Sequence, residues 1–413
     1  MSLLYSMFSV NNRSYKKHVL PHLSGSVSND LMLLVDSSLA FKYDSFQARV
    51  GEWSKLWDVG VDPSCKMPPN SKFTESFDDV SDRSAYQLLE FFRTKNKNRI
   101  IVYYSGGIDS TIVVCSILRN FSTADLKYVD IALSMESIIE NPYFYEHYIK
   151  PNFNVVNSAE HFYGDRSDAV YVSADSGDAM FGTELGLKFY QWFDSLNHQL
   201  CLQGQVQRID NFDPTDTHYS KIQQELILFF NNLRTPIQFD NFTPADTGYN
   251  FGKEFYSKVE HNIRTSGFTI ETVHDFFWWI IFNLKYVHCA LRPAVLYNFA
   301  PNKKAFIEDS LYNWFGNAEY QLWSINNNNT GLKIKGSSPA TYKFAGREYI
   351  YKVDGNTWYK HNKTKLASLP SIIVRNYKDN FSYLDTVFGI DSESYDSVHI
   401  DGDQFKTMLT KFV

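Results

Sequence analysis

The chain has 413 residues, carries 40 Lys and Arg against 46 Asp and Glu, and is 44% apolar. This apolar share excludes intrinsic disorder as the default state, and the length predicts about two domains. No strongly basic block interrupts the mixed charges, so nucleic acid is not an expected partner.

The four cysteines form no C-x-x-C pair, which speaks against a disulfide scaffold and a structural zinc site. The N-terminus lacks the charged-then-apolar order of a signal peptide. The longest apolar run, 276–282, is far too short to span a membrane. We therefore expect a cytoplasmic protein that does not contact membranes.

The first 60 residues alternate short apolar runs with polar breaks and predict a few strands and a short helix. Residues 61–78 are rich in Pro, Ser and Asn, which indicates a loop. Apolar residues then recur at helical spacing in DRSAYQLLEFFRTK, and Ser81 is the expected N-cap of that helix.

Next, the β-branched and aromatic run at 100–104 predicts a buried strand, and 111–119 predicts an apolar helix. Further strands are expected at 128–133 and 169–172, and a helix at 179–196. Strands that alternate with helices are typical of a parallel α/β sheet.

Beyond about residue 215 the pattern changes to long helices rich in Phe, Trp, Ile and Leu, at 223–233 and 271–288. We expect three regions: a small N-terminal region at 1–78, a main α/β domain at 79–375, and a C-terminal tail at 376–413.

The segment YYSGGIDS, which ends at Ser110, carries the strongest chemical signal. A strand, a Gly-Gly turn and a helix follow one another. Gly106 and Gly107 would let the backbone approach a phosphate, and the helix N-terminus adds partial positive charge. Ser105 and Ser110 can donate hydroxyl hydrogen bonds to the same oxygens. The alternative is an ordinary strand–turn–helix connection.

Asp109 would repel an anion unless it holds Mg²⁺, which bridges carboxylate and phosphate oxygens. The segment SGGIDS resembles the S-G-G-x-D-S loop of the N-type ATP pyrophosphatases, or PP-loop superfamily, which cleave ATP to AMP and pyrophosphate. The resemblance implies that the strand ending near Leu133 presents its backbone to adenine. It also implies a pyrophosphate site formed by Ser105, Gly106, Gly107, Asp109 and Ser110.

A second segment, YVSADSGDAMFG at 171–182, resembles the S-G-E-G-x-D-E-x-F-G-G segment of asparagine synthetases. The residues that match in register are Ser173, Asp178, Phe181 and Gly182. The resemblance implies that Asp178 is the second magnesium ligand beside Asp109. Carboxylates at the carboxyl ends of parallel strands would face one crevice. Alternatively, Asp178 caps the following helix.

Departures from the family occur within this second segment. Asp175 stands where the family has a catalytic Glu, so the resemblance implies a catalytic carboxylate with a shorter reach to an incoming amine. Ala179 replaces another acid, and Ala174 and Ser176 replace glycines. These differences leave the substrate open.

A third, looser resemblance concerns two lysine-containing segments. YKFAGREYIY resembles the family's K-x-x-x-R helix through Lys343 and Arg347, and KTKLASLP resembles its R-x-K loop. The resemblance implies that Lys343 and Lys365 are catalytic, with Lys365 stabilising charge on the α-phosphate and Lys363 at the arginine position. A solvated lysine cluster on a surface loop is the alternative.

The sequence thus resembles an asparagine synthetase-like member of the PP-loop superfamily. The expected fold is an α/β, parallel-sheet ATP-pyrophosphatase domain (adenine nucleotide alpha hydrolase-like) with a helical extension. The implied protein is an AMP-forming amide ligase that uses ATP and Mg²⁺ to join a carboxylate to ammonia or an amine.

The family's glutaminase domain does not match, since residue 2 is Ser instead of a cysteine nucleophile. Glutamine is therefore not the expected nitrogen source. Two other functions stay open: a PP-loop enzyme that modifies nucleobases or tRNA, and a nucleotide-binding module without catalysis. The acid, the amine and the oligomeric state also stay open.

Overall fold

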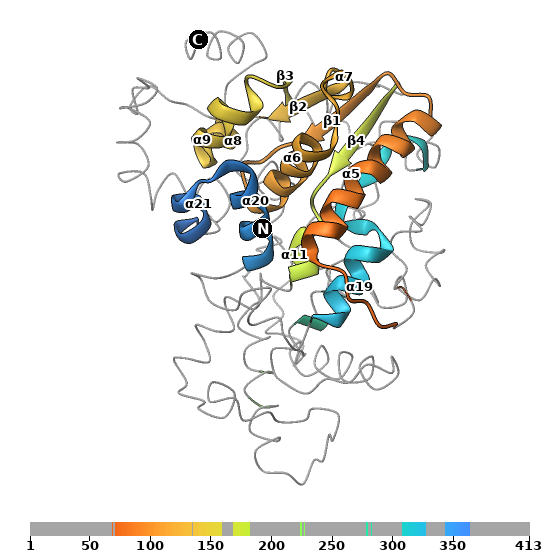
Figure 1. Cartoon of the computed structure of the whole chain (residues 1–413), viewed down its shortest axis with the longest axis vertical. Helices are drawn as coiled ribbons and strands as arrows, with labels where there is room; N and C mark the ends of the chain where they lie inside the picture. Colours follow the sequence, from red (N-terminus) through yellow and green to blue (C-terminus); the bar gives the residue numbers. More distant parts are fainter. Residues whose placement is uncertain are drawn as a thin grey trace, which may run out of the picture.

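The computed structural model describes residues 71–133, 135–158, 168–181, 308–327 and 343–363, together with a few isolated positions. The described part of the chain forms an α/β domain (Figure 1). Nearly all of the expected regions 1–78 and 376–413 lie outside these residues. The predicted helices at 179–196, 223–233 and 271–288 also fall largely outside them.

A five-stranded parallel sheet in the order β3-β2-β1-β4-β5 forms the centre of the domain. This confirms the prediction of a parallel α/β sheet. The strands are β1 (Arg99–Tyr103), β2 (Val129–Leu133), β3 (Asn154–Asn157), β4 (Ala169–Ser173) and β5 (Leu311–Asn313).

The order of the strands reverses direction at β1. From β1 the chain adds β2 and β3 on one side, and it then returns to place β4 on the other side. Val102 of β1 lies beside Val172 of β4, so the connections that leave these two strands start at the same edge of the sheet. Ligands of open α/β sheets bind at such a switch point, outside the carboxyl ends of the strands.

β5 lies in the region beyond about residue 215, where the sequence pattern predicts helices, and no strand was predicted there. It pairs in parallel with β4, with Leu311 opposite Tyr171. A three-residue strand is too short to show the alternation by which strands are recognised in a sequence. In the same part of the chain, Trp278, Trp279 and Phe282 are buried in the main core.

Helix α5 (Phe77–Thr94) begins earlier than expected. Ser76 is its N-cap and forms a capping box with Asp79. The prediction that Ser81 caps the helix was wrong: Ser81 lies inside α5, and its hydroxyl donates to the carbonyl of Phe77 over 2.7 Å. The reciprocal bonds of the capping box satisfy two N–H groups at the helix start, which a serine one turn later cannot do.

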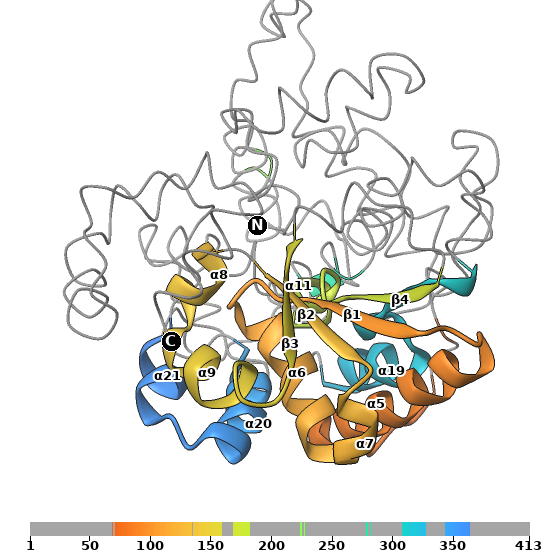
Figure 2. The same ribbon diagram turned by 90° about the horizontal axis from the view of Figure 1, so that it is seen from above.

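The helices α5, α6 (Ile108–Asn120), α19 (Ala318–Asn326) and α20 (Phe344–Asp354) lie on one side of the sheet (Figure 2). No helix of the described part of the chain is both long and apolar enough to cross a bilayer. The shorter helical segments are α7 (Thr123–Leu126), α8 (Met135–Glu140), α9 (Pro142–Phe144), η4 (Tyr145–Ile149), α11 (Gly177–Phe181), η7 (Trp314–Gly316) and α21 (Thr357–Asn362).

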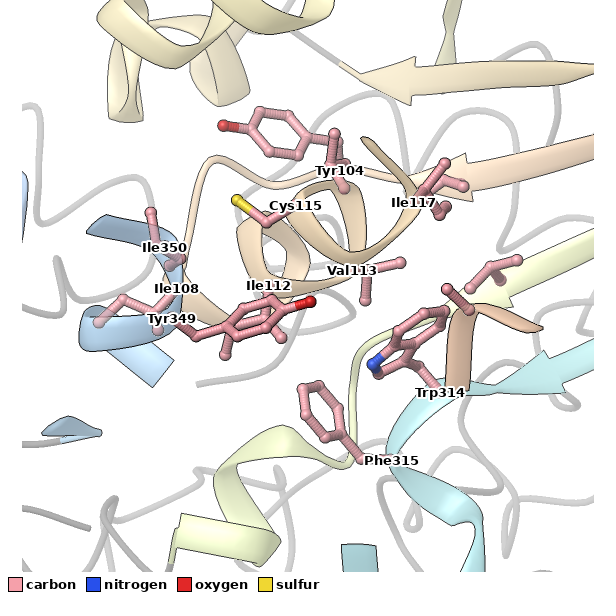
Figure 3. Packing of buried hydrophobic residues seen from close by; sticks show 14 of the residues in the cluster. Tyr104, Ile108, Ile112, Val113, Cys115, Ile117, Trp314, Phe315, Tyr349 and Ile350 are labelled. Carbon is pink, nitrogen blue, oxygen red and sulfur yellow. The ribbon is translucent and has the colours of Figure 1, made fainter. Parts of the chain in front are cut away.

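The main hydrophobic core lies between the sheet and these helices, and α6 is at its centre (Figure 3). Ile112 of α6 is fully buried, and a Cβ atom added at Gly346 of α20 would lie 2.6 Å from its Cδ1. The missing side chain at Gly346 therefore lets α20 approach α6 closely, which brings the start of α20 near the start of α6.

Candidate functional site

The connection from β1 to α6 needs glycine at its first turn. Gly106 has φ +74°, and a Cβ atom there would lie 2.4 Å from the carbonyl oxygen of Ser137 and 2.6 Å from Cβ of Glu140. Both the left-handed backbone and the lack of space exclude a side chain. Neither neighbour of Gly106 could be identified from the sequence, because both belong to the segment that follows β2.

The two serines of SGGIDS hold this connection in a compact turn, residues 105–110, which we call the glycine turn. Their Oγ atoms lie 3.1 Å apart, and the backbone N–H of Ser105 donates to Oγ of Ser110 over 3.1 Å. The N–H of Gly107 lies 3.3 Å from Oγ of Ser105 and donates to it. Ser110 is buried, while Ser105 and Gly107 are partly exposed. The exposed edge of the turn therefore presents one serine hydroxyl and the start of α6.

The N-terminus of α6 has no side-chain cap at Gly107. By contrast, α5, α19 and α21 are capped by Ser76, Asn317 and Asn356. The first N–H groups of a helix carry partial positive charge and have no partner within the helix. The start of α6, reached through a glycine turn, is therefore suited to an anion such as phosphate.

Asp109, Asp178 and Lys343 meet beside this helix start. Asp109 lies in the first turn of α6 and Asp178 in α11, the helix that follows β4. The Nζ atom of Lys343 contacts Oδ2 of Asp109 and lies 2.6 Å from Oδ1 of Asp178. Two carboxylates from the two sides of the switch point thus share one cation position.

Burial strengthens the interaction between these charges. The side chains of Lys343 and Asp178 are 4% and 8% exposed, and that of Asp109 is 19% exposed. The Nζ atom of Lys343 also lies 5.8 Å from the centroid of the Phe181 ring. Charges in such partly desolvated surroundings attract one another more strongly than charges in water.

Gly177 brings α11 against Asp109, a contact that the sequence pattern does not predict. A Cβ atom at Gly177 would lie 2.5 Å from Cγ of Asp109. Its signal in the sequence was its place directly before Asp178, but a glycine in a turn has many explanations. Only the structure shows that its missing side chain makes room for the Asp109 carboxylate.

Lys343 has a left-handed backbone, with φ 56° and ψ 37°, at the N-cap position of α20. This conformation is costly for a residue with a side chain and is frequent at functional sites. The backbone N–H of Arg347 donates to the Lys343 carbonyl over 3.0 Å, so the first turn of α20 fixes the position of the lysine backbone.

Residues of α20 and α21 support the glycine turn through hydrogen bonds. The hydroxyl of Tyr359 donates to the carbonyl of Gly106 over 3.3 Å. Arg347, which is buried, donates to the carbonyl of Lys360 over 2.9 Å and to that of Lys363. No periodicity in the sequence indicates Tyr359, because its partner lies in a distant segment.

Lys363 adds a buried ion pair to the same region. Its Nζ atom lies 2.5 Å from Oε1 of Glu140 and 3.3 Å from the Glu140 carbonyl oxygen. Burial lowers the pKa of the Lys363 ammonium, and the Glu140 carboxylate opposes that shift. Since Glu140 also packs against Gly106, this pair joins α21 to the wall of the glycine turn.

The remaining candidate residues have different positions. Leu133 ends β2, next to β1, and its side chain is fully buried in the core, so only its backbone could meet a ligand. Asp175 is partly exposed in the turn between β4 and α11, where its N–H donates to Oγ of Ser173 over 3.2 Å. Lys365 lies outside the described residues.

Asp109 and Asp178 are the two carboxylates that could ligate a divalent cation, at the position that the Lys343 ammonium occupies. Among the described residues, no group of three or more His, Cys, Asp and Glu side chains is placed to hold a metal ion. Magnesium is commonly held by one or two carboxylates, with phosphate oxygens and water completing its coordination. These two carboxylates would therefore suit Mg²⁺ that arrives with a phosphate ligand.

The chain matches no protein-family model, no curated protein and no solved structure with which it was compared. The chemistry of the site follows from the residues that the fold brings together at the switch point between β1 and β4.

Proposed function

We propose that this protein is an ATP-dependent, AMP-forming amide ligase of the asparagine synthetase-like type within the PP-loop superfamily. One observation carries the proposal: Asp109 after β1 and Asp178 after β4 share a cation position beside the uncapped start of α6. Asp109 lies in the segment that resembles the PP-loop, and Asp178 lies in the segment that resembles the second motif of asparagine synthetases.

In this proposal the glycine turn binds the β- and γ-phosphates of ATP. The first N–H groups of α6 and the Ser105 hydroxyl would donate to phosphate oxygens, while Ser110 keeps the turn in shape from its buried position. Backbone donors at a helix start need no reorganisation when the ligand arrives, which favours tight binding of the leaving pyrophosphate.

Asp109 and Asp178 would hold Mg²⁺, which neutralises charge on the departing pyrophosphate. Lys343, which lies between the same carboxylates, would move to a phosphate oxygen when nucleotide binds. A cation placed at developing negative charge stabilises the transition state of phosphoryl and nucleotidyl transfer.

The reaction would have two steps. A substrate carboxylate oxygen forms a bond to the α-phosphorus of ATP, and the bond from that phosphorus to the β-phosphate oxygen breaks and releases pyrophosphate. Ammonia or an amine then bonds to the acyl carbon, loses a proton and displaces AMP. Asp175, in the turn after β4, is our candidate acceptor for that proton, and Lys365 is our candidate cation for the adenylate.

The decisive experiment measures pyrophosphate and AMP from ATP, MgCl₂, ammonia and a panel of small carboxylic acids with the purified chain. We expect at least one acid to stimulate pyrophosphate release. Asp109→Asn should lower the rate about 100-fold or more, whereas Asp168→Asn, a matched change at an exposed position before β4, should leave it unchanged.

Formation of ADP and phosphate without AMP would contradict the proposal. ATP binding without pyrophosphate release for any acid would instead support a nucleotide-binding module. Pyrophosphate release that depends on a nucleobase or tRNA, and not on an acid, would support a modifying enzyme of the same superfamily.

A further inference from the structure

Lys343 occupies the position at which Asp109 and Asp178 would bind a divalent metal. The lysine ammonium lies between Asp109 and Asp178, 2.6 Å from Asp178 Oδ1. A divalent cation bound by the same two carboxylates would need the oxygens that the ammonium contacts. Metal and ammonium, both positive, would also repel each other at so short a distance.

We infer that Lys343 is a resident counter-cation that excludes free divalent metal, so that the site accepts metal only together with the phosphates of a nucleotide. This inference rests on the proposed function, because it assigns Asp109 and Asp178 to the metal. Nucleotide phosphates supply negative charge for both cations, so the ammonium can leave the carboxylates when the metal enters with its phosphate ligands.

Three features of the structure hold Lys343 in this role. Its side chain is only 4% exposed, so water cannot easily replace the carboxylates as its partners. Its left-handed backbone and its carbonyl bond to Arg347 fix the point from which the side chain extends. Phe181 packs near the ammonium and adds the attraction of its ring face.

Removing the Lys343 ammonium should allow a divalent metal to bind Asp109 and Asp178 without nucleotide. Two carboxylates without their counter-cation repel each other, and a divalent metal relieves that repulsion. Lys343→Met, which keeps the length of the side chain without its charge, should therefore bind Mn²⁺ in the absence of nucleotide at least about tenfold more tightly than the wild type. Lys343→Arg keeps the charge and should bind Mn²⁺ as weakly as the wild type.

The test titrates the nucleotide-free full-length chain with MnCl₂ and measures free Mn²⁺ by electron paramagnetic resonance. Lys352→Met is the matched control, because Lys352 also lies on α20 and pairs with an acid, Asp78, but is half exposed. This control should bind Mn²⁺ like the wild type. Adding Asp109→Asn to Lys343→Met should abolish the gained affinity, which locates it at the shared carboxylates.

Thermal unfolding gives a second readout. MnCl₂ without nucleotide should raise the melting temperature of Lys343→Met clearly more than that of the wild type. If Lys343→Met gains no Mn²⁺ affinity, the inference is wrong. If the lysine variants do not fold, the wild type still decides: Asp109-dependent binding of one Mn²⁺ with micromolar affinity and no nucleotide contradicts the inference.

The two proposals can fail separately. Pyrophosphate release by the wild type without a gain in Mn²⁺ affinity by Lys343→Met would overturn the counter-cation role alone. A gain in affinity without pyrophosphate release for any acid would overturn the ligase function and support the counter-cation role.

Discussion

Gly177 and Asp109 are in such close contact that a single added methyl group would not fit between them: a Cβ atom at residue 177 would lie 2.5 Å from Cγ of Asp109. Asp109 in turn contacts the ammonium of Lys343. The backbone of one switch-point segment therefore sets the position of the carboxylate that belongs to the other.

Gly177→Ala should accordingly displace Asp109 and lower Mg²⁺-dependent pyrophosphate release about tenfold or more, because small displacements of catalytic groups are costly. Gly355→Ala is the matched control. Gly355 has φ +61° with open space around its Cα atom, so alanine there should cost about 1 kcal/mol of stability and leave the rate unchanged. Equal rates for both variants would mean that the Asp109 position is not critical.

Asp109→Asn and Asp178→Asn should each lower Mg²⁺-dependent turnover about 100-fold or more, since both carboxylates are assigned to one metal. The double variant should be no slower than either single variant, because residues that act as one unit are not additive. If Asp178→Asn lowers the melting temperature but not the rate, Asp178 is only a structural residue of α11. Steady-state rates with purified, folded variants make this comparison.

Tyr359→Phe should loosen the glycine turn. Its hydroxyl donates to the Gly106 carbonyl over 3.3 Å and lies 3.4 Å from the Thr111 hydroxyl. Removing it should cost about 1 kcal/mol of stability and raise the Kd for ATP, which calorimetry can measure. Tyr86→Phe, at an exposed tyrosine of α5, should change neither, and an unchanged Kd in Tyr359→Phe would show that α21 does not support the turn.

Asp354 should make the stability of the fold depend on pH. It lies buried at the end of α20, and burial raises its pKa to about 6. Within the described residues, its Oδ2 atom has no hydrogen-bond partner. The folded protein therefore holds this proton more tightly than the unfolded chain does. Protonated Asp354 therefore contributes its full stability to the fold below pH ~4, and this contribution is lost as the pH rises through about 6.

Asp354→Asn should therefore stabilise the protein at pH 8 by about 1–3 kcal/mol and have little effect near pH 4. Its amide oxygen can still accept the N–H of Asn356, as Asp354 does over 2.8 Å. Urea unfolding at both pH values measures the difference. Asp125→Asn should act in the opposite sense, because a hydrogen bond from Ser122 lowers the pKa of Asp125. No gain for Asp354→Asn at pH 8 would mean that the carboxylate is not destabilising.

The sequence alone determined the features whose physical cause is local. The buried strands β1, β2 and β4 were predicted within a residue of their observed ends, because continuous apolar runs bounded by turns mark strands of a parallel sheet. The glycine turn with Ser105 and Ser110 was recognisable for the same reason, since all of its groups lie within a few residues. Even a local feature was predicted wrongly where the helix start was concerned, since Ser76 and not Ser81 caps α5.

Only the tertiary structure decided which distant residues meet. The contact of Lys343 with Asp109 and Asp178, the bond from Tyr359 to Gly106 and the space for Asp109 beside Gly177 each join segments that no periodicity links. They arise because strand order places the ends of β1 and β4 side by side and because close packing at Gly346 brings α20 to α6. The local sequence pattern determines the helices and strands, whereas the packing of side chains from different elements determines which residues form a site.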